Sequence, residues 1–263
     1  MISVVGIPFD EFSSFMRGPA QAPPKIREAY HSGSSNYFTE GLADLEGHNG
    51  WRDEGDLVLP EGPGAIPAIN TAISTLLKKS DKVLSLGGDH SVTYPVVKAF
   101  AEKHGPLTLL HLDAHNDLYH DFEGNPYSHA SPFARIMEEG LANRLVQVGI
   151  RTMNAHQSGQ AKRFGVEVIE MKDWKGDDRF HLEGPVYISL DLDVVDPAFA
   201  PGVSHHEPGG FTTREVLSII QHIKGNVVGA DLVELNPARD PSGITAMLAA
   251  KLYKELLHLL LHS

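Results

Sequence analysis

Histidine and aspartate residues gather at three places where an apolar run of the sequence ends. These are Gly87-Gly88-Asp89-His90-Ser91, Asp113-Ala114-His115-Asn116-Asp117 and Asp191-Leu192-Asp193. Carboxylate oxygens and imidazole nitrogens suit divalent cations such as Mn²⁺. Because the chain has no cysteine, thiolate ligands, disulfides and cysteine nucleophiles are excluded. Any metal must therefore be held by His and carboxylate side chains.

The apolar runs before these segments have the composition of buried parallel strands. They cover residues 83–86, 107–112 and 186–190. Ligands of an open parallel sheet bind beyond the carboxyl ends of its strands. If the backbone stays extended there, Asp113, His115 and Asp117 share one face, as do Asp191 and Asp193. Four carboxylates crowded together would repel one another unless two divalent cations compensated them, so the sequence predicts a binuclear site.

Each member of this set also has an ordinary structural explanation. A lone Asp after a strand usually forms a turn or caps a helix, and a lone His is usually a surface or core residue. Only the joint pattern favours metal binding. We expect Asp89 and Asp196 to support turns or orient ligands. His205 and His206 lie in a loop rich in Gly and Pro, so we expect them to be exposed and leave them outside the predicted site.

Further β-branched and Leu-rich runs alternate with segments of helical periodicity, which predicts βαβ units. The additional strands are expected at 2–7, 145–150, 166–169 and 227–233, and the helices at 65–79, 95–104, 131–140, 213–224 and 245–261. Thr212 and Glu215 form the sequence pattern of a capping box. Residues 40–61 and 117–131 are expected to be looser. The predicted fold is a single α/β domain over 1–263, with three α/β/α layers and a mostly parallel, doubly wound sheet.

Net charge and hydropathy limit the partners. The formal charge is −12 with scattered Lys and Arg, which argues against a nucleic-acid partner and favours a small cation. No apolar stretch reaches the roughly 18 residues of a membrane span, and Met1 leads directly into an apolar run without a basic leader. We therefore expect a cytoplasmic protein without membrane contact.

The three polar segments, read with their neighbours, resemble the signatures of the ureohydrolase family, which comprises arginase, agmatinase and formimidoylglutamase. The matching motifs are Gly-Gly-Asp-His-Ser, Asp-Ala-His-Asn-Asp and Ser-Leu-Asp-Leu-Asp-Val-Val-Asp-Pro. The resemblance extends over nearly the whole chain, through Gly6-Ile-Pro-Phe-Asp10, Arg17-Gly-Pro-Ala, Gly55-Asp56, Gly149-Ile-Arg151 and Ala230-Asp-Leu-Val-Glu234-Leu-Asn-Pro.

The resemblance implies two Mn²⁺ per subunit, with another divalent ion such as Ni²⁺ as an alternative. It places one ion on His90, Asp113, Asp117 and Asp191 and the other on Asp113, His115, Asp191 and Asp193. A hydroxide bridging the metals would attack a guanidino carbon, releasing urea and an amine. Glu234 would hold the guanidinium, His129 would contact substrate and shuttle protons, and Asp117 would orient the nucleophile and help protonate the leaving amine. A homotrimer or homohexamer is also implied.

For the substrate, the motifs resemble agmatinase most closely, which predicts conversion of agmatine to putrescine and urea in polyamine metabolism. An arginase is expected to present several Asn and Ser side chains in residues 118–131, where only Asn125 and Ser128 occur. Arginase, guanidinobutyrase, guanidinase and formimidoylglutamase activities stay open. Two alternatives of another class are a non-catalytic metal-binding relative and a single-metal amide deacetylase.

Overall fold

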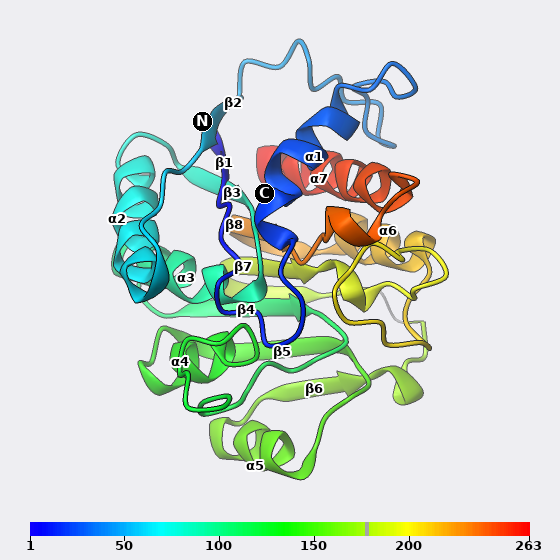
Figure 1. Cartoon of the computed structure of the whole chain (residues 1–263). Helices are drawn as coiled ribbons and strands as arrows, with labels where there is room; N and C mark the ends of the chain where they lie inside the picture. Colours follow the sequence, from blue (N-terminus) through cyan, green and yellow to red (C-terminus); the bar gives the residue numbers. More distant parts are fainter. Residues whose placement is uncertain (177–178) are drawn as a thin grey trace.

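The centre of the molecule is an eight-stranded sheet in which every pair of neighbouring strands is parallel. The computed structural model describes residues 1–176 and 179–263. The strand order is β2-β1-β3-β8-β7-β4-β5-β6 (Figure 1). The strands are β1 (Ile2–Gly6), β2 (Trp51–Asp56), β3 (Lys82–Leu86), β4 (Leu107–Leu112), β5 (Ala142–Ile150), β6 (Glu167–Glu170), β7 (His181–Asp191) and β8 (Lys224–Val233).

Helices cover both faces of this sheet, as a parallel sheet requires. On one face lie α1 (Ala22–Tyr30), α6 (Thr213–His222) and α7 (Ile244–His262) (Figure 1). On the other lie α2 (Ala65–Leu77), α3 (Thr93–His104), α4 (Pro132–Glu138) and α5 (Ala155–Phe164). The predicted three-layer architecture is confirmed. None of the described helices is long and apolar enough to cross a bilayer.

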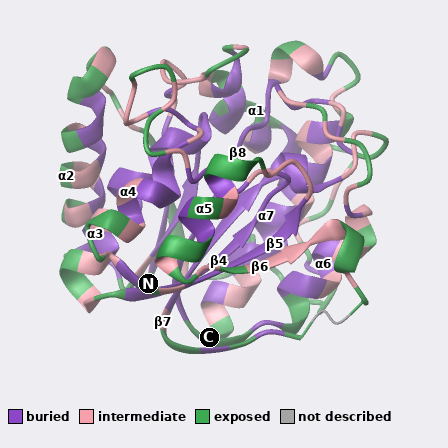
Figure 2. Ribbon diagram, turned by 90° about the horizontal axis from the view of Figure 1, so that it is seen from below, coloured by how far each residue is buried: buried purple, intermediate pink, exposed green. Residues whose placement is uncertain are grey.

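The sheet is buried because its strands carry apolar side chains on both faces. All six residues of β4 are buried, and Figure 2 shows the central strands as a continuous buried layer. Phe100 and Tyr187 are fully buried on one side, and Phe211 on the other. Burial of each such side chain contributes roughly 1.5–3 kcal/mol relative to exposure. This packed layer gives the strand ends fixed positions.

Three elements differ from the sequence prediction. The edge strand β2 has the charged sequence Trp-Arg-Asp-Glu-Gly-Asp and lies in a region expected to be loop. Exposed charge is common on an edge strand, where it discourages pairing with other chains. The helices α1 and α5 were also not predicted. The start of α5 carries a signal of its own, because Asn154 and Gln157 form a capping box like the confirmed one of Thr212 and Glu215.

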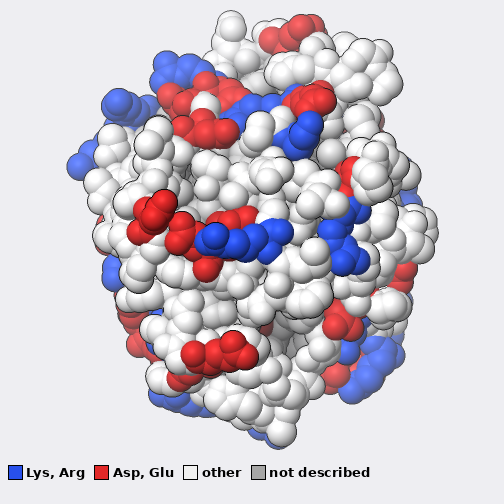
Figure 3. All heavy atoms as spheres, viewed as in Figure 1, with Lys and Arg blue, Asp and Glu red and all other residues white. Residues whose placement is uncertain are grey.

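Acidic and basic side chains are interspersed on the surface, although the net charge is negative. On the face shown in Figure 3, Lys and Arg side chains lie beside Asp and Glu side chains. Elsewhere in the structure, the guanidinium of Arg27 contacts Asp53 and Asp56 of β2. The distribution on this face agrees with the scattered basic residues of the sequence.

Candidate metal centre

Four adjacent strands, β3, β8, β7 and β4, end at the same edge of the sheet. The residues that follow or close them are His90, Glu234, Asp191 and Asp113. It is not their order along the chain that makes these strands neighbours. In the sheet, β7 and β8, which come late in the sequence, lie between β4 and β3. The predicted ligands therefore converge at a point where the winding of the sheet changes direction, the usual ligand crevice of such folds.

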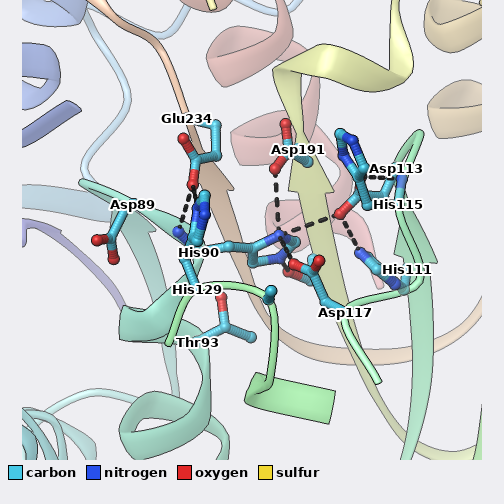
Figure 4. Close-up of polar contacts among 12 residues, drawn as sticks. Asp89, His90, Thr93, His111, Asp113, His115, Asp117, His129, Asp191 and Glu234 are labelled. Carbon is cyan, nitrogen blue, oxygen red and sulfur yellow. Dashed lines mark hydrogen bonds and ion pairs between the residues drawn. The ribbon is translucent and has the colours of Figure 1, made fainter. Parts of the chain in front are cut away.

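His90 points its Nδ1 atom into a ring of carboxylates (Figure 4). The distances from Nδ1 are 3.1 Å to an Oδ2 atom of each of Asp113, Asp117 and Asp191. Adjacent ligands of an octahedral ion held at about 2.1 Å lie about 3.0 Å apart. Nδ1 is buried and has no hydrogen-bond partner among the described residues. This donor set fits a divalent cation.

The other ring nitrogen of His90 is held by a buried chain of hydrogen bonds. Nε2 lies 2.9 Å from Ser189 Oγ, and Ser189 donates to Asp231 Oδ1 at 2.7 Å. Thr93 and Tyr187 donate to the second oxygen of Asp231 at 2.9 and 2.8 Å. Since Ser189 gives its proton to Asp231, it accepts the proton of Nε2. Nδ1 is then the nitrogen with a lone pair, as a metal ligand needs.

A second group of ligand atoms lies beside the first. His115 Nδ1 is 2.9 Å from Asp193 Oδ2 and 3.5 Å from Asp113 Oδ1. Asp113, His115 and Asp193 together could hold an ion. Because Asp113 presents one oxygen to His90 and the other to His115, it can serve both positions. Asp191 joins the groups, since its Oδ1 accepts the Asp193 backbone N–H at 2.8 Å. All six predicted ligands are thus brought together.

Burial and mutual repulsion disfavour the charged forms of two carboxylates in the cluster. Burial and the carboxylates of Asp193 and Asp113 raise the pKa of Asp191 well above its usual value. Burial, with a further contribution from Asp113, raises the pKa of Asp193 to about 6. Burial disfavours the cationic forms of His90 and His115, but the surrounding Asp side chains outweigh it and raise both pKa values. Cations in this position would stabilise the carboxylates.

The backbone brings these side chains together by turns rather than by extended alternation. Asp117 has a φ of 46°, so it is not part of an extended segment with Asp113, contrary to expectation. Asp193 likewise lies in a 3-10 turn, Leu192–Val194. Gly88, in the turn before His90, allows the Phe9 backbone to approach closely, because a Cβ there would lie 1.8 Å from the carbonyl oxygen of Phe9. The convergence was predicted correctly, but its geometric reason was wrong.

Glu234 and His129 form a pair on the wall of the centre (Figure 4). His129 Nδ1 lies 2.8 Å from Glu234 Oε1, which also accepts the backbone N–H of His90 at 2.8 Å. Burial disfavours the imidazolium, but the Glu234 carboxylate raises the pKa of His129 to about 9. On the other side of the ring, Nε2 lies 3.0 Å from the backbone nitrogen of Ser14 and 2.7 Å from its hydroxyl oxygen. A hydroxyl can donate to the neutral ring or accept from the imidazolium, so Ser14 can accompany both protonation states of His129, which suits a proton carrier.

A cavity of about 150 Å³ opens above the cluster. Its lining comprises Ser14, His115, Asp117, Tyr119, Phe122, His129, Ala130, Gln157, Asp191, Asp193, His205 and Glu234. His205 belongs to it, so the expectation that this residue lies outside the site was wrong. Its ring centroid is 5.5 Å from that of His115 and 5.4 Å from that of His129. Sequence alone offers no signal for this, because the loop position is decided by distant contacts.

The other expectations for this region are met. Asp89 caps the turn after β3 by accepting the Ser91 N–H. Asp196 accepts the N–H groups of Gly209 and Gly210, and His206 is exposed. Asn125 and Ser128 lie outside the lining and stabilise turns, in which they accept the N–H groups of residues 127 and 130.

Three buried polar residues were missed by the sequence analysis. His111 places Nε2 2.7 Å from Asp113 Oδ2 and stacks its ring on Phe133 with centroids 3.8 Å apart. Ser189 and Asp231 orient His90, as described above. The sequence feature that could have revealed them is that each is a polar residue within a run of apolar residues that forms a buried strand. A polar residue in such a position needs a buried partner.

Comparison with known proteins agrees with this geometry and with the predicted fold. The model of the arginase family matches residues 1–258. The chain is 49% identical to Arginase 1, mitochondrial, of Arabidopsis thaliana, over 97% of this chain and 79% of that protein. It is 35% identical to the agmatinase of Bacillus subtilis, over 96% of this chain and 89% of that protein. The solved structure of arginase from Medicago truncatula has a TM-score of 0.94 at 45% identity, covering 98% of this chain and 87% of that one. On motifs, fold and centre alike, the chain belongs to the arginase family.

Proposed function

We propose that this chain is a manganese-dependent hydrolase that cleaves the guanidino group of L-arginine to urea and L-ornithine. The observation that carries the reaction class is the convergence of three carboxylates on the unpartnered Nδ1 of His90, beside the His115–Asp193 pair. Arginine is preferred to the agmatine first predicted because the plant arginase is 49% identical and the agmatinase 35%.

The donor sets assign two positions to the metal ions. One would be held by His90, Asp113, Asp117 and Asp191, and the other by Asp113, His115, Asp191 and Asp193. When bound, two divalent cations lower the pKa of water and so supply hydroxide near neutral pH. Hard oxygen donors with two imidazoles suit Mn²⁺.

Glu234 is placed to bind the guanidinium. Its Oε1 is occupied by the His90 N–H and His129, whereas Oε2 has no hydrogen-bond partner among the described residues. Burial raises the pKa of Glu234, but the neighbouring His129 charge and the hydrogen bonds lower it below its usual value, so the group is a carboxylate. A buried carboxylate and a planar guanidinium form a strong, directional pair.

The leaving amine must gain a proton as the C–N bond breaks, and two side chains can move it. Asp117 lines the cavity and faces His90, where an attacking water would give up its proton. His129 lines the same cavity and holds a proton on Nδ1 against Glu234. We assign Asp117 to the first transfer and His129 to exchange with solvent, with general acid–base catalysis of this kind worth about 10²- to 10⁴-fold in rate.

Agmatine is the second candidate, and one observation favours it. None of the residues lining the described cavity is Lys or Arg, so the α-carboxylate of arginine meets no cationic side chain there. Agmatine shares the guanidinium and an ammonium group with arginine but lacks that carboxylate. The homo-oligomeric state and the cytoplasmic location stay predictions.

The test is urea release by metal-stripped protein that is reloaded with Mn²⁺ or Ni²⁺. Arginine, agmatine, guanidinobutyrate and guanidine are compared in parallel, with formamide release measured for a formimino substrate. We expect about two metal ions per chain by elemental analysis and urea from arginine. Asp193→Ala removes one ligand and should abolish both activity and the second ion, whereas the exposed control Asp173→Ala should retain both.

Other outcomes would identify the alternatives. Urea release from agmatine alone would identify agmatine as the substrate and leave the proposed reaction unchanged. One metal per chain would support a single-metal amide hydrolase, and two metals without turnover of any substrate would support a non-catalytic relative.

A further inference from the structure

Gln157 presents a fixed pair of hydrogen-bond donors at the cavity. The residue is 4% exposed and belongs to the cavity lining. The backbone N–H of Asn154 lies 3.1 Å from its Oε1 in the capping box of α5. Since that N–H is a donor, the atom facing it must be the amide oxygen, and the amide nitrogen must face away. Nε2 has no acceptor among the described residues, so its two N–H groups are free for a ligand.

Tyr119 presents a second donor that is oriented by the same residue. Asn154 Nδ2 donates to the Tyr119 hydroxyl oxygen at 2.5 Å, so the hydroxyl hydrogen points elsewhere. The ring is fixed by stacking on His156, with centroids 5.5 Å apart, and by an edge contact with Phe122 at 5.2 Å. Tyr119 and Phe122 also line the cavity. Asn154 therefore orients both donors, the Gln157 amide nitrogen and the Tyr119 hydroxyl, so that their hydrogens point away from Asn154.

Gln157 belongs to the first turn of α5, and Tyr119 contacts Asn154 and His156 at the start of the same helix. Backbone N–H groups there have no intrahelical acceptor, and the helix dipole favours an anion. The lining residues of the cavity otherwise offer carboxylates and imidazoles for the guanidino end of a substrate. Neutral donors beside a helix N-terminus are what a carboxylate needs where no cationic side chain is present.

We propose that Gln157 and Tyr119, oriented by Asn154, form a subsite for the α-carboxylate of the substrate and so select arginine over agmatine. This inference rests on the proposed hydrolysis of a guanidino substrate, whose other end is held at Glu234.

The sharpest variant is Gln157→Glu. Glutamate at this helix position preserves the capping box, since its oxygen also accepts the Asn154 N–H. The only change at the cavity replaces two N–H donors by a carboxylate oxygen. We expect the ratio of kcat/KM for arginine to that for agmatine to fall by at least about 10-fold, with an unchanged Tm. Tyr119→Phe should lower the ratio in the same direction while keeping the ring contacts. The exposed Gln21→Glu adds the same charge outside the cavity and should leave the ratio unchanged.

A binding measurement separates this inference from the catalytic proposal. Calorimetric titration of the manganese-loaded protein with L-ornithine and with putrescine compares ligands with and without the carboxylate, and needs no turnover. We expect the wild type to prefer ornithine and Gln157→Glu to lose that preference.

If the wild type hydrolyses arginine but neither variant changes the ratio, the subsite is refuted and the proposed function stands. If the wild type releases no urea from arginine, the proposed function fails, and the titration tests the subsite separately. The subsite is refuted if the wild type does not prefer ornithine to putrescine, or if Gln157→Glu keeps that preference.

Discussion

Glu234 occupies a backbone conformation that side chains avoid. Its φ of 66° is left-handed, which costs a non-glycine residue roughly 1–3 kcal/mol. Three contacts hold it there: its N–H donates to the Gly88 carbonyl at 3.0 Å, and its Oε1 accepts from His90 and His129. Strain that is held by the surrounding structure is typical of functional positions. Asp117, with a φ of 46°, shares this property.

Glu234→Gln tests the guanidinium contact. The amide retains an acceptor for the His90 N–H but removes the negative charge that faces the substrate. Loss of one partner of a buried charged pair costs about 2–5 kcal/mol, so kcat/KM should fall by roughly 30-fold to several thousand-fold. Metal content should not change, because Glu234 is not among the proposed ligands. Steady-state kinetics and elemental analysis measure the two effects, and Glu28→Gln on the exposed side of α1 is the control. A loss of metal in Glu234→Gln would contradict the assignment.

At the scale of elements, the centre depends on contacts between neighbouring strands. Ser189 in β7 and Asp231 in β8 face each other in register and lie beneath His90. Asp231 is fully buried and is satisfied by three hydroxyl groups. The strand pair therefore sets both the position and the tautomer of a ligand at its end.

Ser189→Ala should weaken metal binding without removing a ligand. The substitution leaves His90 Nε2 and one oxygen of Asp231 without their partner. Loss of such an orienting contact typically lowers metal affinity by about 10- to 100-fold. Competition with a chelator measures the affinity. Ser85→Ala in β3 is a matched control, because Ser85 is equally buried and its hydroxyl has no hydrogen-bond partner among the described residues. Equal affinities in the two variants would exclude the proposed role.

The capping box of α6 gives a second prediction at this scale. Thr212 accepts the backbone N–H of Glu215 at 3.2 Å, and Glu215 accepts the N–H of Thr212 at 2.9 Å. Thr212→Ala removes the first contact and should lower the free energy of unfolding by about 1 kcal/mol. Chemical denaturation of the metal-stripped protein measures this. Thr213→Ala, one residue further along, lies outside the box and should have a smaller effect; the opposite order would show that the cap contributes little.

For the whole molecule, the charge at the centre couples folding to pH and to metal. The pKa values of His90, His115 and His129 lie above the ordinary value of 6.5, and that of His129 is about 9. The folded, metal-free protein therefore retains protons that the unfolded chain has released. This contribution to stability is complete below pH 6.5 and is lost as the pH rises through the folded-state values.

The Tm of the metal-stripped protein should consequently fall between pH 6.5 and about 9. Added Mn²⁺ should raise the Tm by an increment that grows over the same range, because imidazole ligands must lose their protons to bind. Scanning calorimetry with and without Mn²⁺ measures both trends. His129→Asn should reduce the slope of the metal-free protein. A metal-free Tm that rises with pH would show that these histidines do not hold protons in the folded state.

Much of the site was predictable from local sequence. His90, the Asp113–Asp117 segment and the Asp191–Asp193 pair each end a run of apolar residues, and strand periodicity depends only on near neighbours. The start of α6 was also predictable from local sequence, because a capping box is complete within four residues. Family membership followed from these short motifs.

Other features were decided by contacts between residues far apart in the chain. Strand order, which brings β3, β8, β7 and β4 side by side, cannot be read from periodicity because the apolar runs have similar composition. The left-handed backbone of Asp117 and the position of His205 over the centre depend on packing against distant loops. The exposed edge strand β2 has no buried face and hence no alternating pattern. Local sequence therefore determined which groups are present, and tertiary structure decided which of them meet, because their distances are set by the packing of the whole sheet.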